Sequence, residues 1–139
     1  MISESEDATR AFAAALAKTL VAGDIVALTG PLGAGKTAFA QAMARALGVV
    51  GPVTSPTYAL VNRYADGRVL HADLYRLEDD DEVEALGFWD EVEDGAIAIV
   101  EWAERSSAIV QAARYHVVID DIGATRRAIT VRERAPRSS

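Results

Sequence analysis

The stretch Gly30-Pro31-Leu32-Gly33-Ala34-Gly35-Lys36-Thr37 matches the phosphate-binding pattern G-x-x-x-x-G-K-[ST] at every defined position. The apolar run that precedes it, residues 24–29, is typical of a buried strand. The residues that follow it, 38–47, are rich in helix formers, and Gly48 can end that helix in a left-handed conformation. The stretch therefore lies between a strand and a helix, the setting in which such a loop binds phosphate groups.

The residue types of this stretch fit the binding of a nucleotide. Glycines allow successive backbone N–H groups to turn toward an anion, and the following helix adds the positive end of its dipole. Lys36 brings a full positive charge to the outer phosphates, and the hydroxyl of Thr37 is a ligand for Mg²⁺. The alternative is a glycine-rich turn with an incidental Lys-Thr pair. Because strand, loop and helix agree, we predict a nucleotide-binding protein.

Length and composition predict a single domain over residues 1–139, with a short frayed tail from about residue 135. The chain has no cysteine, which excludes disulfides and thiolate metal sites. Its acidic start and the lack of a long apolar run predict a soluble cytoplasmic protein without a membrane segment, monomeric on its own. The net charge of −7 argues against a broad nucleic-acid surface and is compatible with a basic partner.

Strand and helix patterns continue along the rest of the chain. We expect helices at residues 5–21, 83–86 and 103–113, and strands at residues 58–64, 69–73, 96–100, 116–120 and 128–132. A hairpin at Asp66-Gly67, directly after the helix of the glycine loop, interrupts a purely alternating order. This pattern predicts an α/β domain of the P-loop NTPase type, with three layers and a mixed parallel and antiparallel sheet whose antiparallel strands lie at one side. The acidic run 78–82 is expected to be solvated, with an electrostatic docking patch as the lesser alternative.

Further candidate residues follow predicted strands. Glu101 comes after five apolar residues, where a phosphate-binding loop needs a carboxylate for its Mg²⁺. Asp73 also ends a strand and is a weaker candidate, while His71 beside it is expected to be structural. Ser55-Pro56-Thr57 is similar to a loop that senses the γ-phosphate, although hydroxyls beside proline are common in turns. Trp102 could pack in the core, against the nucleotide or against a partner.

Four blocks of the sequence together resemble one family. They are GPLGAGKTAF at 30–39, SPTYALVNRY at 55–64, HADLYRL at 71–77 and VEW at 100–102. In this order and spacing they resemble the TsaE (YjeE) family, small ATPases of bacterial tRNA threonylcarbamoyladenosine (t6A) biosynthesis. The resemblance extends from about Thr9 to Arg126.

The resemblance implies where a nucleotide binds. ATP or ADP would lie on Gly33, Ala34, Gly35, Lys36, Thr37 and Ala38. Thr9, Trp102 and Arg126 match family positions near the nucleotide. At Ala38 the family usually has a second hydroxyl, so the resemblance implies the loss of one possible phosphate contact here.

The resemblance also implies the chemistry and the partners. Thr37 and Glu101 match the Mg²⁺ ligands and Asp73 an acid needed for hydrolysis, with Lys36 stabilising the developing charge. Family members hydrolyse ATP slowly alone, work in a complex with TsaD and TsaB, and reach tRNA only through it. Two alternatives remain: a small-metabolite kinase, which would need arginines where residues 78–84 are acidic, and a non-hydrolysing nucleotide sensor that regulates a partner.

Overall fold

Both helices and strands occur along the residues that the computed structural model describes, which are 1–31, 33–54 and 60–134. The helices are α1 (Glu6–Ala17), α2 (Lys36–Ala46), α3 (Asp80–Ala85), α4 (Phe88–Glu93) and α5 (Ser107–Ala112), with a 3-10 turn η1 (Ala103–Arg105). The strands are β1 (Ile2–Ser3), β2 (Ile25–Thr29), β3 (Val61–Tyr64), β4 (Val69–Asp73), β5 (Ile97–Glu101), β6 (Tyr115–Gly123) and β7 (Arg126–Glu133).

The strands form one mixed sheet in the order β1-β7-β6-β2-β5-β4-β3. Its four central strands, β4, β5, β2 and β6, run parallel to one another. Antiparallel pairs lie at both edges, β3 with β4 on one side and β6 with β7 and β7 with β1 on the other. The predicted mixed α/β sheet is confirmed, but the placement of antiparallel strands at one side only is wrong, because the last two strands form a second hairpin.

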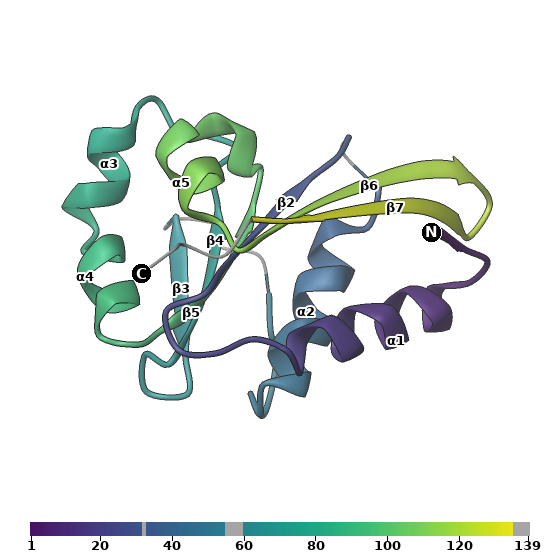
Figure 1. Cartoon of the computed structure of the whole chain (residues 1–139), viewed down its shortest axis with the longest axis horizontal. Helices are drawn as coiled ribbons and strands as arrows, with labels where there is room; N and C mark the ends of the chain where they lie inside the picture. The colour runs from purple at the N-terminus through teal and green to yellow at the C-terminus, as the bar shows by residue number, and fades with distance from the viewer. Residues whose placement is uncertain (32, 55–59, 135–139) are drawn as a thin grey trace.

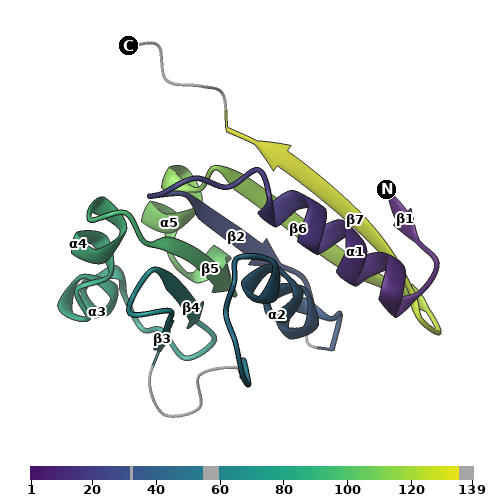
Figure 2. The same ribbon diagram turned by 90° about the horizontal axis from the view of Figure 1, so that it is seen from below.

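Helices cover both faces of the sheet, as Figure 1 shows: α1 and α2 lie on one side, and α3, α4 and α5 on the other. The central strand β2 is buried throughout, and its side chains alternate between the two layers. Val26 and Leu28 pack with α1 and α2, whereas Ile25 and Ala27 pack with the helices of the opposite face. The view in Figure 2 places β1 beside β7 at one edge of the sheet and β3 at the other. The predicted three-layer arrangement is therefore confirmed.

Local capping explains where most helices begin. Ser5 caps α1 as its sequence predicts, since its side chain accepts a hydrogen bond from the N–H of Ala8. Asp79 caps α3 in the same way, so this helix begins earlier than the predicted residues 83–86. The helix expected at 103–113 is divided into η1 and α5, and Ser106 caps α5. No helix within these described ranges is long and apolar enough to span a membrane.

Two elements are not predicted by the sequence patterns. The strand β1 has only two residues, too few to show an alternation of apolar and polar side chains. The helix α4 buries only Phe88 and Val92, and the rest of it is acidic or amphipathic. Residues 58–59 of the predicted strand 58–64, and the tail from residue 135, lie outside the described residues.

Candidate nucleotide-binding site

The glycine loop leaves the sheet at the carboxyl end of its central strand. Gly30 follows β2, and Leu28 near the end of β2 pairs in register with Glu101 of β5. Ligands of open parallel sheets bind outside such carboxyl ends. Gly30 has a φ of +149°, and a Cβ there would lie closer than 3.0 Å to the backbone oxygen of Ile119. Only glycine therefore fits between the loop and the neighbouring strand β6.

Lys36 is the first residue of α2, and its ammonium group turns back over the loop. Its Nζ donates hydrogen bonds to the carbonyl oxygens of Gly30 and Pro31, the second at 3.0 Å. It also lies 4.0 Å from the centroid of the Trp102 ring, a cation–π contact. Burial lowers the pKa of Lys36. Nearby carboxylates oppose this shift, that of Glu101 most strongly. Only 5% of the residue is exposed, so its charge acts in a partly desolvated setting.

Glu101 links the loop helix to the sheet. Thr37 Oγ1 donates a 2.8 Å hydrogen bond to Glu101 Oε1, and the other carboxylate oxygen lies 2.5 Å from His71 Nε2. Glu101 is 2% exposed and His71 is completely buried. Nδ1 of His71 has no hydrogen-bond partner among the described residues, so a proton on Nε2, donated to Glu101, explains the pair best. His71 thus holds the carboxylate in the orientation that presents its other oxygen to Thr37.

Asp73 lies beside Glu101 at the end of the adjacent parallel strand, and the two residues pair in register. Its Oδ1 accepts a hydrogen bond of 3.0 Å from the N–H of Tyr75. Burial raises the pKa of Asp73, and the nearby charge of Glu101 adds to the rise. The side chain therefore has a greater tendency to accept a proton than an exposed aspartate has.

Trp102 directly follows β5 and has a left-handed backbone, with a φ of +55°. A left-handed conformation is rare for a large side chain and marks a position held by its surroundings. Its ring packs against Tyr75 at a centroid separation of 5.0 Å and against the Lys36 ammonium. Trp102 thus forms a side wall of the site.

These side chains surround one cavity of about 370 Å³. It is lined by Gly33, Gly35, Lys36, Thr37, Asp73, Glu101 and Trp102. The structure thus brings together the predicted residues Lys36, Thr37, Asp73, Glu101 and Trp102, which come from three separate parts of the sequence. A pocket with an ammonium group, backbone amides and two carboxylates at one end can accommodate a phosphate chain with a divalent cation.

The donor set fits Mg²⁺. The Thr37 hydroxyl and the Glu101 carboxylate are hard oxygen ligands of the kind that Mg²⁺ prefers. Within the described part of the chain, no three His, Asp or Glu side chains are grouped to hold a metal ion. Two protein ligands suit a Mg²⁺ ion that is held mainly by phosphate oxygens and water, as is usual for this ion at nucleotide sites.

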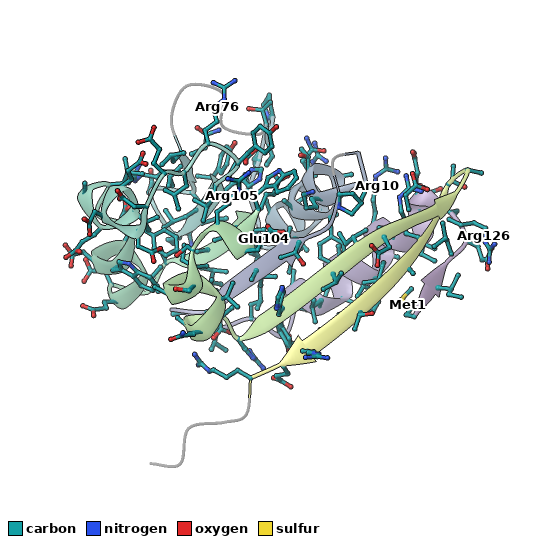
Figure 3. All side chains as sticks on the ribbon, turned by 90° about the horizontal axis from the view of Figure 1, so that it is seen from above. Met1, Arg10, Arg76, Glu104, Arg105 and Arg126 are labelled. Carbon is teal, nitrogen blue, oxygen red and sulfur yellow. The ribbon has the colours of Figure 1, made fainter. Side chains whose placement is uncertain are left out.

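A second, smaller pocket of about 50 Å³ adjoins the loop on the side of α1. It is lined by Glu6, Thr9, Arg10, Ala34, Gly35, Ala38, Thr125 and Arg127. Thr9 and Ala38 therefore lie next to the loop. Arg126 does not line this pocket: it forms an ion pair of 2.9 Å with Glu4, is 46% exposed, and lies at the outer edge of the sheet beside β1 (Figure 3). Its neighbour Arg127 contacts the loop instead.

Arg127 was missed as a candidate, His71 was considered and expected to be structural, and one candidate segment is not described. His71 lies two residues before Asp73 in β4, so strand alternation places both on one face, a signal that could have identified it. Arg127 has no such signal, because nothing in its local sequence indicates a contact with a loop far away in the chain. The predicted switch-like segment Ser55-Pro56-Thr57 lies outside the described residues.

Known proteins of one family are similar to this chain. The family model described as threonylcarbamoyl adenosine biosynthesis protein TsaE matches residues 3–129. Two curated proteins named tRNA threonylcarbamoyladenosine biosynthesis protein TsaE are similar over most of their length. The one from Aquifex aeolicus is 44% identical over 109 residues (76% of this chain, 77% of the relative). The one from Bacillus subtilis is 37% identical over 124 residues (88% and 77%).

Two further comparisons extend the match. A relative of the same name from Nostoc is 44% identical over 97 residues, which span 65% of this chain and only 59% of that protein. The crystal structure of Bacillus subtilis YdiB superimposes with a TM-score of 0.69 at 29% sequence identity, covering 94% of this chain and 82% of that one. Because the family model matches nearly the whole chain and the fold is shared, this chain belongs to the TsaE family.

Proposed function

We propose that this chain takes part in tRNA threonylcarbamoyladenosine biosynthesis as a Mg²⁺-dependent ATPase that drives or resets the modifying enzyme. The names of its relatives support the pathway. The observation that carries the ATPase assignment is the single cavity in which Lys36, Thr37, Asp73 and Glu101 meet beside the glycine loop. Such a set has a charge for the phosphates, two cation ligands and an acid that can orient water.

In this proposal the loop and Lys36 bind the phosphates. Backbone N–H groups of residues 33–37 contact the phosphate oxygens, and the Lys36 ammonium stabilises the charge that develops on the γ-phosphate during cleavage. The ammonium has three N–H donors, and the carbonyls of Gly30 and Pro31 accept from it. Two of the three donors are thus used by the loop carbonyls, and the third would donate to a phosphate oxygen when the nucleotide binds.

Thr37 and Glu101, which both line the cavity, would hold the cation. When bound, Mg²⁺ neutralises charge on the outer phosphates. The Thr37 hydroxyl and the Glu101 carboxylate already contact each other at 2.8 Å, so both ligands converge on one place. His71 keeps the carboxylate in that orientation.

Asp73 is proposed to orient the attacking water. Its raised pKa favours the acceptance of a proton as the water oxygen bonds to the γ-phosphorus and the bond to the ADP oxygen breaks. Asp73 is next to Glu101 in the sheet, so it also lies close to the cation ligands. Trp102 packs on Lys36 and lines the same cavity.

The partners follow from the family. We propose that the chain, a monomer on its own, works in the cytoplasm in a complex with TsaD and TsaB and reaches tRNA only through that complex. Its net charge of −7 supports an indirect role at tRNA, because a surface that binds the phosphate backbone directly is basic.

Steady-state ATP hydrolysis with Mg²⁺ tests the proposal. Lys36→Ala and Glu101→Ala are expected to abolish turnover and to keep the fold, as measured by circular dichroism. Lys18→Ala is a matched control, since Lys18 is the only other lysine and is exposed on the surface. Wild-type turnover in either site variant would contradict the assigned roles.

Reconstituted tRNA modification separates the alternatives. With TsaD, TsaB, tRNA, ATP and a preformed activated threonylcarbamoyl donor, we expect t6A formation to depend on this chain and to fail over repeated turnovers when a non-hydrolysable analogue replaces ATP. Absence of ATP turnover both alone and with the partners would support the nucleotide sensor. Transfer of phosphate to a small metabolite would support the kinase, although the corresponding region, residues 78–84, is acidic and suits a phosphate clamp poorly.

A further inference from the structure

Arg127 in β7 makes a contact that the proposed function does not yet explain. Its Nε donates a hydrogen bond of 2.9 Å to the carbonyl oxygen of Ala34, 93 residues earlier in the chain and inside the glycine loop. Only 15% of the side chain is exposed. The contact joins the loop to the antiparallel edge of the sheet, where β7 pairs with β6 and with β1.

The guanidinium group of Arg127 is itself fixed at the end of the β6–β7 hairpin. Its Nη1 donates to the carbonyl oxygens of Arg126 at 2.8 Å and Ala124 at 3.2 Å, and lies 3.4 Å from Asp121 Oδ1. A guanidinium is planar, so fixing one of its nitrogens also fixes the direction of the others. The donor that meets Ala34 therefore has its direction set by the hairpin before any ligand binds.

The direction of the Ala34 carbonyl matters for the loop. In a trans peptide, the C=O and the following N–H point in opposite directions. Holding the Ala34 carbonyl toward Arg127 therefore turns the N–H of Gly35 the other way. Gly35 lines the larger cavity with Lys36, and glycine loops bind phosphate through such N–H groups. A carbonyl turned toward the phosphate would instead repel it.

We propose that Arg127 is a positioning residue of the glycine loop, which it holds in its anion-binding conformation through the Ala34 carbonyl. The inference rests on the phosphate-binding role proposed above. In it Arg127 acts through the peptide and does not contact the phosphate. The competing explanation is a direct contact with the nucleoside, since Arg127 also lines the smaller pocket with Thr9.

Calorimetric titration with two probes, each in the presence of Mg²⁺, distinguishes these explanations. One probe is ATP and the other is inorganic tripolyphosphate, which has no nucleoside. Arg127→Gln is expected to weaken the binding of both by about tenfold, or about 1.4 kcal/mol. Arg127→Lys keeps a charged donor and should recover part of the affinity for both. Arg132→Gln is the matched control, because Arg132 is an exposed arginine on the same strand that lines neither pocket, and it should bind like the wild type.

Hydrogen exchange at the amides of residues 33–37 provides a readout that is independent of affinity. Without ligand, we expect faster exchange there in Arg127→Gln than in Arg132→Gln. The positioning role is overturned if this exchange is unchanged, if both probes bind Arg127→Gln as they bind the wild type, or if only ATP binding is weakened, which would assign Arg127 to the nucleoside. Wild-type protein that binds neither probe would remove the proposed function itself, and the positioning role with it.

Discussion

Replacement of Gly30 by alanine should damage both the fold and the site, because the loop passes directly over β6. The added Cβ would stand closer than 3.0 Å to the carbonyl oxygen of Ile119 and 3.3 Å from its carbonyl carbon. Both are backbone atoms of a buried strand that cannot turn aside as a side chain can. The loop or the strand must therefore move by roughly an ångström, which costs about 1–3 kcal/mol as overpacking does elsewhere.

Gly48 provides a control for the backbone conformation. Its φ is also positive, at +97°, but a Cβ there would meet nothing within 4 Å. The alanine variant of Gly48 thus carries a conformational cost of about 1–2 kcal/mol and no steric clash. For 139 residues the entropy of unfolding is about 0.3 kcal/mol per kelvin, so the extra clash in Gly30→Ala should lower the melting temperature by about 3–10 °C relative to Gly48→Ala.

Differential scanning calorimetry of the two variants measures this difference, and titration with ADP and Mg²⁺ measures its consequence for the site. The Gly30 carbonyl accepts a hydrogen bond from Lys36, so its displacement should weaken nucleotide binding by about tenfold, roughly 1.4 kcal/mol. Gly48→Ala should bind normally. Equal melting temperatures for the two variants would refute the reasoning.

Other substitutions test the remaining parts of the structure. Asp73→Asn should abolish turnover yet raise stability at pH 7 by about 0.5–2 kcal/mol, because a carboxyl group with a raised pKa destabilises the folded state once it is ionised. That gain should shrink as the pH falls through the raised pKa and vanish below the ordinary value of 3.8, which thermal melts across this range will show. His71→Ala removes the donor to the buried Glu101 carboxylate and should lower the free energy of unfolding, measured by urea denaturation, by about 1.5–3 kcal/mol. The same change at the partly exposed His116 should lower it less. Phe39→Ala leaves a cavity at a fully buried position in α2 and should lower the free energy of unfolding by about 3–5 kcal/mol in the same assay.

Local features of the chain were sufficient to predict which residues meet at the centre of the candidate site. The glycine loop is contiguous, and the strand and helix on either side of it have clear patterns, so its place in the fold follows directly. Glu101 was predicted because it ends a run of apolar residues, and parallel strands bring their carboxyl ends to one edge of the sheet. Asp73 meets Glu101 for the same reason.

Contacts between distant segments were beyond such reasoning. Apolar alternation predicts that β7 is a strand, but it does not determine which of its two adjacent arginines faces the loop. The structure turns Arg127 to Ala34, while Arg126 pairs with Glu4 at the edge. That edge itself depends on β1, a strand of two residues with no sequence signal, whose Ser3 pairs in register with Arg127.

The most direct test of the account is calorimetric titration of the folded protein with ATP and with ADP, each with Mg²⁺. The glycine loop, Lys36 and the Thr37–Glu101 pair predict saturable heat at one site, which Lys36→Ala should remove and Lys18→Ala should not. Well-folded wild-type protein that releases no heat with either nucleotide would contradict the central claim that this cavity binds a nucleotide.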